Sequence, residues 1–276
     1  MPVLHVALIH NRNEERLAAI RPDIQRMVEE HAATISEHAW QTDLSASPLT
    51  TLRLLKANRR HERMHREHLR FRGRPRARST LRPALITAAK SFIRGDRLVR
   101  YRGALIEQLL TDKHIRAWTT FIDSEADVLI VLEDDAVFRT DSFHGLAALI
   151  QRIGPDIARP IYVDVAGGFP LRKVVDPRLG KVAWSGVTEF PIPFTNTTCG
   201  YLATRPLVVA MLERVTWDSE LRSLGVDWLI NELMMRCHRD EPVICFHTDP
   251  PVLSHGSLTG IYQSEIASRP LPKAQG

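Results

Sequence analysis

The sequence predicts an α/β fold in which a mostly parallel sheet is flanked by helices. Apolar runs of strand length, such as residues 3–9 and 127–132, alternate with longer segments of helical periodicity, such as 14–31 and 98–121. The second of these strands is apolar on both faces, as expected of a central strand covered by helices. With 276 residues and 44% hydrophobic composition, the chain can bury a full core.

The other elements follow from local patterns. Pro22 inside the first helix predicts a kink or a break. Further predicted elements are a strand at 33–40, a loop at 42–50, helices at 84–93 and 142–153, a strand at 160–165, a polar loop at 194–201, helices at 206–215 and 226–237, and a strand at 241–246. We expect a single domain over residues 1–276, with a basic insertion at about 43–97.

Positive charge is concentrated in one segment. Residues 53–102 hold 17 Lys/Arg and 3 Asp/Glu, so the remainder of a chain whose net charge is +5 carries −9. This segment could contact anionic lipid, grip an acidic polysaccharide acceptor, bind nucleic-acid phosphates or form a solvated helical hairpin. Few aromatic residues are interleaved with the arginines, so we do not expect nucleic-acid binding.

Sequence features also bear on location. No apolar run is long enough for a transmembrane helix, and the three cysteines form no C-x-x-C pair. The apolar start lacks a basic leader and a cleavage site, which favours a first strand over a signal peptide. We therefore expect a cytoplasmic location, to which the lipid interpretation of residues 53–102 adds peripheral contact with the inner face of the membrane.

Three adjacent carboxylates, Glu133-Asp134-Asp135, follow the buried strand. Open α/β sheets bind ligands beyond the carboxyl ends of their strands. Adjacent carboxylates repel one another unless they are protonated or bridged by a cation, and Mg²⁺ and Mn²⁺ prefer oxygen ligands. The residues alone leave two interpretations open, a divalent-metal site and a solvated turn.

Five segments resemble, in chain order, glycosyltransferase family 25, the lipooligosaccharide galactosyltransferase-like enzymes. They are residues 9–16, 114–118, 131–136, 198–202 and 226–228. The first segment is one residue shorter than the family's turn. Lys113, just before the second segment, stands where the family usually has Ser. The resemblance covers the chain except residues 43–97 and the final tail. It implies a GT-A fold, a nucleotide-sugar donor and usually an inverting reaction.

The resemblance implies a metal site at the acids. Asp135 is expected to ligate Mn²⁺ or Mg²⁺, and Glu133 or Asp134 to bind the ribose or a metal-bound water, with Glu133 as a further metal candidate. His255 is either a third metal ligand or an exposed loop residue. His247 is its rival for that role.

The remaining candidates concern the donor and the base. Asn11 and Arg16 are expected to hold the nucleotide, although Arg16 could also be a solvated helix residue. Asn196 is expected to bind sugar hydroxyls or to cap the helix that follows it. Asp227 is the candidate base for the acceptor hydroxyl or a helix cap, and Glu232, one turn later, is the fallback.

These features predict a metal-assisted glycosyltransferase (a hexosyltransferase) that moves a sugar from a UDP-sugar to a glycan or lipid-linked acceptor of the cell surface, as in lipopolysaccharide biosynthesis. Two other classes remain as alternatives. One is a nucleic-acid- or anionic-surface-binding protein that uses the Arg-rich segment. The other is a metal-dependent nucleotidyltransferase, which usually has a Gly-rich loop after the first strand, whereas residues 10–13 contain no glycine.

Overall fold

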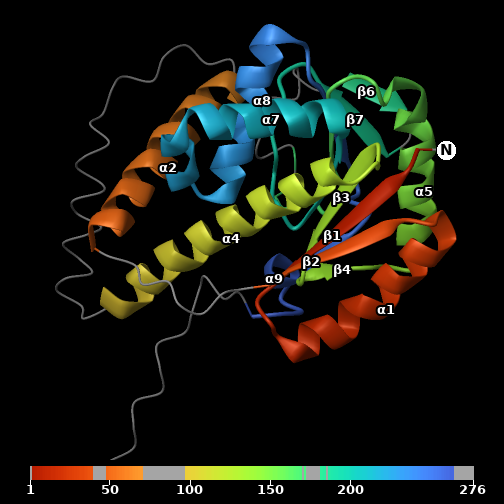
Figure 1. The fold of residues 1–276 in the computed structure, drawn as a ribbon, viewed down its shortest axis with the longest axis horizontal. Coiled ribbons are helices and arrows are strands. Elements are labelled where there is room, and N and C mark those ends of the chain that lie inside the picture. The colour runs from red at the N-terminus through yellow and green to blue at the C-terminus, as the bar shows by residue number, and fades with distance from the viewer. Residues whose placement is uncertain are drawn as a thin grey trace, which may run out of the picture.

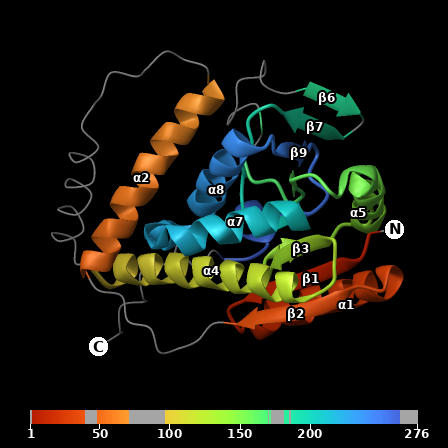
Figure 2. The same ribbon diagram turned by 45° about the horizontal axis from the view of Figure 1, so that its top comes forward.

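The computed structural model describes residues 2–39, 48–70, 97–169, 171, 181–184 and 186–263. Its centre is an eight-stranded sheet in the order β2-β1-β3-β8-β5-β9-β7-β6 (Figure 1, Figure 2). The strands are β1 (Leu4–His10), β2 (Thr34–Ala39), β3 (Val128–Glu133), β5 (Ile161–Asp164), β6 (Lys181–Trp184), β7 (Val187–Phe190), β8 (Gly200–Thr204) and β9 (Ile244–Thr248). The helices are α1 (Glu14–His31), α2 (Pro48–Arg70), α4 (Arg97–Asp123), α5 (Ser142–Ile153), α7 (Arg205–Trp217), α8 (Val226–Asp240) and α9 (Gly256–Thr259), with short 3-10 helices η1 (Gly154–Asp156) and η3 (Ser219–Ser223).

The sheet is mixed, but most of its central strands share one direction. β2, β1, β3, β5 and β9 point the same way, and β8 runs antiparallel between β3 and β5. The predicted mostly parallel α/β sheet is therefore confirmed. The predicted loop at 194–201 is wrong for its last two residues, which begin β8. All five β8 residues are buried, so the strand shows no alternation, and its place in the sheet depends on its two neighbours.

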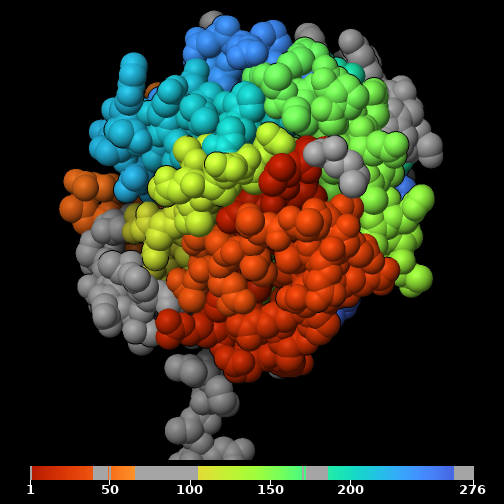
Figure 3. Space-filling model, turned by 45° about the vertical axis from the view of Figure 1, so that its right-hand side comes forward, coloured from red at the N-terminus to blue at the C-terminus, as the bar shows by residue number. Residues whose placement is uncertain are grey.

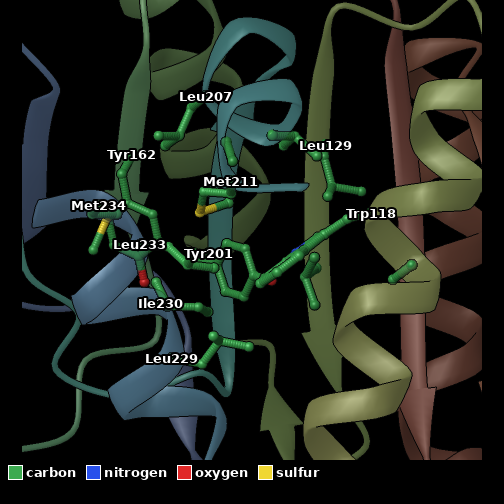
Figure 4. Close-up of a cluster of buried hydrophobic side chains, with 14 of the residues drawn as sticks. Trp118, Leu129, Tyr162, Tyr201, Leu207, Met211, Leu229, Ile230, Leu233 and Met234 are labelled. Atoms are coloured by element: carbon green, nitrogen blue, oxygen red, sulfur yellow. The ribbon is translucent and has the colours of Figure 1, made fainter. Parts of the chain in front are cut away.

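Alternate residues of the central strands enter two hydrophobic cores on opposite faces of the sheet. Leu129 and Tyr201 belong to the core formed with α4, α7 and α8, where Trp118 donates its indole N–H to the Tyr201 hydroxyl at 2.9 Å (Figure 4). Ile130 and Leu202 belong to the core formed with α1 and α5. In the space-filling view α1, in red and orange, covers a broad area of this second face (Figure 3).

Most predicted helices and strands are confirmed within a few residues, and α1 corrects one detail. The helix runs unbroken from Glu14 to His31 with Pro22 inside it. Pro22 is exposed, so water can satisfy the carbonyl that its missing N–H leaves free. Asn13 starts the helix by accepting a hydrogen bond from the Arg16 amide at 3.2 Å. Strands β6 and β7 have no counterpart in the sequence prediction.

The first part of the basic segment is a helix that belongs to the fold. α2 contacts α4 and α8, and Leu54 is fully buried. Asn58 donates to Glu107 of α4 at 2.7 Å and accepts from the Gly225 amide at 2.8 Å, which satisfies the first backbone donor of the α8 terminus. The helix predicted at 84–93 lies outside the described residues. In the described ranges, no helix is both long and apolar enough to cross a lipid bilayer.

Candidate active site

The carboxyl end of β3 carries the three acids, and a distant segment folds over them. β4 (Ala136–Val137) follows Asp135 directly and pairs antiparallel with β10 (Ser254–His255). The Gly256 amide donates to the Asp135 carbonyl at 2.8 Å, which fixes the start of α9 beside the acids. As a result, His255 Nδ1 lies 3.4 Å from Asp135 Oδ2.

Gly256 has no room for a side chain at this junction. A methyl group there would lie 2.5 Å from Tyr262 Cδ2 and 2.8 Å from the Asp135 carbonyl oxygen. We expect Gly256→Ala to push α9 off the acids and to lower the free energy of unfolding by about 1–3 kcal/mol, measured in urea. Gly154→Ala is the control, because its nearest contact would be at 3.9 Å. Equal stability of the two variants would contradict this account.

Asp135 is the centre of a cluster of side chains of the types that bind metal ions. Its Oδ1 accepts a hydrogen bond from the Cys199 thiol at 3.3 Å, and its Oδ2 accepts one from the Ser257 hydroxyl at 2.5 Å. One donor atom each from Asp135, Cys199 and His255 lie within 4.8 Å of one another. Carboxylate, thiolate and imidazole are all ligands that proteins use for divalent metals.

The His255 ring supplies a further sign that the cluster fits a cation. Its Nδ1 is buried and makes no hydrogen bond within the described part of the chain, although it faces the Asp135 carboxylate. An unsatisfied buried nitrogen is costly, and a metal ion is one of the groups that can satisfy it. The expectation of a metal site therefore gains a structural basis at Asp135 and His255. Glu133 is not part of this close group of donors.

Asp134 has a structural role at the turn between β1 and α1. Its Oδ1 accepts from Arg16 Nη1 at 2.9 Å, and its Oδ2 accepts from the Asn11 amide at 3.0 Å. Arg16 is buried, also donates to the Gln263 carbonyl, and lies 5.2 Å from the centre of the Tyr262 ring. Asp134 and Arg16 thus hold the first turn and the C-terminal segment together, although both line the hollow described below.

Glu133 is the last residue of β3, and its side chain contacts the buried His114 of α4, which in turn contacts Tyr201 of β8. Its Oε1 lies 3.2 Å from His114 Nε2, and His114 Nδ1 lies 3.0 Å from the Tyr201 hydroxyl. Burial lowers the pKa of His114 to about 3, so the ring is neutral at physiological pH. Burial, and then the charge of Asp135, raise the pKa of Glu133 to about 7. Glu133 can therefore hold a proton near neutral pH.

Asp227 lies in the first turn of α8, where Gly225 is the N-cap. The cap interpretation of Asp227 is therefore wrong, because the residue is already inside the helix. Asp227 is exposed as a residue and lines the hollow described below. Although Asp227 is an exposed residue, the protein around its carboxyl, and then the charge of Glu133, raise its pKa above the usual range of an aspartate. This raised pKa suits Asp227 to exchange a proton with a bound ligand.

These groups surround one hollow of about 360 Å³. It is lined by Asn11, Arg16, Ile106, Leu110, Glu133, Asp134, Asp135, Phe169, Asn196, Thr197, Thr198, Asp227, His255, Ser257 and Leu258. Asn196 exchanges two hydrogen bonds with the Phe169 backbone, so it holds the exposed Phe169 at the rim. The buried Asp164 accepts from the Asn196 amide at 2.9 Å. Asn196 does not cap a helix, because β8 separates it from α7.

Glu232 and His247 lie apart from this hollow. Glu232 lines a second hollow of about 320 Å³ between α2, η3 and α8, where it lies 3.0 Å from His61 and accepts from Arg236 at 2.8 Å. His247 is buried in β9, where its Nε2 lies 3.0 Å from the Phe194 carbonyl. The fold therefore brings Asp227, rather than Glu232, to the acids, and His255 rather than His247.

The ion pairs of Glu232 predict a loss of stability in acid. The hydrogen bond from His61, and then that from Arg236, lower the pKa of Glu232 from 4.5 to about 2. Because the folded pKa is depressed, this stabilisation is present above pH 4.5 and is lost as the pH falls toward 2. We expect wild type to lose up to about 2 kcal/mol more than Glu232→Gln between pH 5 and pH 2.5, measured by urea unfolding. Parallel pH profiles would contradict this assignment.

Comparison with known proteins adds no identification. No protein-family model matches the chain, and no curated protein matches it either. The site therefore has to be interpreted from its own geometry. Sequence reasoning singled out Asp135 and His255 but missed Cys199 and Ser257 as their partners. The available signal was weak, because Cys199 stands in a polar segment 64 residues after Asp135 in the chain.

Proposed function

We propose that this protein is a metal-assisted glycosyltransferase with a GT-A-like fold, related to family 25, that transfers a sugar from a nucleotide-sugar to a glycan or lipid-linked acceptor. One observation carries the proposal: a cluster of metal-binding side chains and an acid–base carboxyl, Asp227, face the same hollow at the carboxyl end of β3. Open α/β sheets bind ligands at such ends. The ordered resemblance of five sequence segments supports the same class.

In an inverting transfer, Asp227 acts as the base, and Asp135 and His255 are the candidate metal ligands. Asp227 accepts the proton of the acceptor hydroxyl as that oxygen bonds to the anomeric carbon, while the bond from this carbon to the diphosphate oxygen breaks. The sugar passes through an oxocarbenium-like state. Asp135 and His255 would hold a divalent cation, which would supply charge neutralisation for the departing diphosphate. Thr198 lines the same hollow as Glu133 and Asp227, so its hydroxyl lies among the groups that would face a bound sugar.

The rim of the hollow offers an aromatic ring on which a nucleotide base or a sugar ring can stack. Phe169 is 59% exposed and offers a ring face that a nucleotide base or a sugar can stack on. Asn196 keeps this ring in place through the two hydrogen bonds to its backbone. Asn11 and Arg16 contribute by shaping the turn after β1, since Asp134 holds both of them.

A ligand screen tests the proposal. Thermal unfolding is followed with a panel of nucleotide-sugars, UDP-sugars first, in the presence and absence of a divalent metal. Binding to the folded state raises the unfolding temperature by mass action, and we expect a metal-dependent rise for at least one donor. Release of the nucleoside diphosphate is then measured for wild type and Asp227→Asn. The variant should still bind the donor but release the nucleotide more slowly by about 100-fold or more. If metal stabilises the protein but no donor shifts it further, the proposal fails.

A further inference from the structure

The chemistry of the donor cluster determines which metal it can take. We propose that Cys199 is a direct ligand together with Asp135 and His255, so that the site selects a thiophilic ion of the Zn²⁺ or Co²⁺ class over Mn²⁺ and Mg²⁺. This inference deepens the proposed function, because it names the cofactor of the same site. It departs from the Mn²⁺ or Mg²⁺ expected from the sequence.

The spacing of the donors fits coordination of one ion, because one donor atom each from Asp135, Cys199 and His255 lie within 4.8 Å of one another. Cys199 Sγ lies 3.3 Å from Asp135 Oδ1, and His255 Nδ1 lies 3.4 Å from Asp135 Oδ2. With metal–sulfur bonds of about 2.3 Å and metal–nitrogen or metal–oxygen bonds of about 2.0–2.1 Å, the ligands of a tetrahedral zinc lie roughly 3.3–3.6 Å apart. Small side-chain rotations could therefore bring the three donors onto one ion.

The mixture of donors argues against a hard cation. Mg²⁺ requires a nearly octahedral shell of oxygen atoms, whereas this cluster supplies one carboxylate, one imidazole and one thiol. Thiolates select soft or borderline metals, and imidazole suits zinc and cobalt. Cys199 is 1% exposed, so its sulfur lies on the protein side of the cluster. Asp135 and His255 line the hollow, so the fourth position opens toward a ligand bound there, as in catalytic zinc sites.

Cobalt spectroscopy tests the ligand set without reference to catalysis. The full chain is stripped of metal with a chelator and titrated with Co²⁺. A cobalt–thiolate bond gives a charge-transfer band in the near ultraviolet, and tetrahedral geometry gives strong visible bands. We expect both in wild type, displacement of Co²⁺ by an equimolar amount of Zn²⁺, and no displacement by excess Mg²⁺.

Variants assign the band to one sulfur. Cys199→Ser should lose the charge-transfer band and bind Co²⁺ more weakly by more than about 100-fold. Even residues that only hydrogen-bond to the metal ligands contribute 10- to 100-fold to metal affinity. Cys237→Ala, which removes a buried thiol from α8, is the matched control and should keep the band. His255→Gln should keep the band but lose affinity, so loss of a ligand other than the sulfur can be distinguished from loss of the sulfur itself.

The outcomes also separate this inference from the proposed function. A wild-type protein without the band, or a Cys199→Ser variant that keeps it, overturns the cysteine ligand even if donors bind with Mn²⁺. Conversely, a cobalt–thiolate band with no binding of any nucleotide-sugar leaves the metal assignment standing and removes the glycosyltransferase.

Discussion

Under the proposed function, Asp135→Asn is expected to reduce nucleotide-sugar turnover by more than about 100-fold, because the substitution removes the charge at the centre of the candidate metal site. Loss of a residue that hydrogen-bonds to a metal ligand already lowers metal affinity or activity 10- to 100-fold, and loss of a direct ligand lowers them more. The amide matches the carboxylate in size and can still accept the hydrogen bond from Ser257. The fold should therefore persist while metal affinity, measured by titration calorimetry, falls in parallel with turnover.

An exposed acid provides the control for this experiment. Asp141 is 77% exposed at its side chain and lies outside the residues that line the hollow. Asp141→Asn should leave both metal affinity and turnover unchanged. If Asp135→Asn retained wild-type turnover with saturating metal, the metal-assisted mechanism would be wrong.

Asp134→Ala is expected to lower the free energy of unfolding by about 3–5 kcal/mol. The Asp134 and Arg16 side chains are only 6% and 7% exposed, so the truncation removes a carboxylate that pairs with a buried guanidinium. It also removes the acceptor of the Asn11 amide and loosens the turn after β1. Equilibrium urea unfolding gives the change directly. Replacing both partners, as in Asp134→Leu with Arg16→Met, should recover part of the loss.

Helix α1, which contains Arg16, supplies an exposed ion pair for comparison with Asp134→Ala. Arg26 and Glu30 of α1 also form an ion pair, but their side chains are 60% and 42% exposed. Solvent screens such a pair, and exposed helical pairs contribute only about 0.3–0.5 kcal/mol. Glu30→Ala should therefore have a small effect. Similar losses for Glu30→Ala and Asp134→Ala would show that Asp134 is not a buried anchor.

Part of the candidate site could be predicted because it follows one strand. The acids stand beside an apolar run whose length and symmetry indicate a central strand, so their place at its carboxyl end needed no tertiary information. Their separate roles could not be predicted. Glu133 contacts His114, Asp134 pairs with Arg16, and Asp135 meets Cys199, and each partner is distant in the chain.

β8 shows the same limit in the fold. Its sequence, Gly200 to Thr204, follows a polar segment and is too short to show periodicity, yet it lies between β3 and β5 in the sheet. Because backbone hydrogen bonds to two neighbours specify such a strand, its own residues carry little signal. Cys199 stands immediately before β8, so its position relative to the sheet could not be predicted from the local sequence either.

The sequence by itself determined the α/β class, the long helices and the position of the acids after β3, because hydrophobic periodicity is a local property of the chain. The resemblance to family 25 also pointed to Asp227 and, as one of two interpretations, to His255 as a metal ligand. Only the tertiary structure decided that these residues share one hollow with Cys199, and that Glu232 belongs to another. Convergence of this kind depends on strand order and on the pairing of β4 with β10, which join residues more than 100 positions apart.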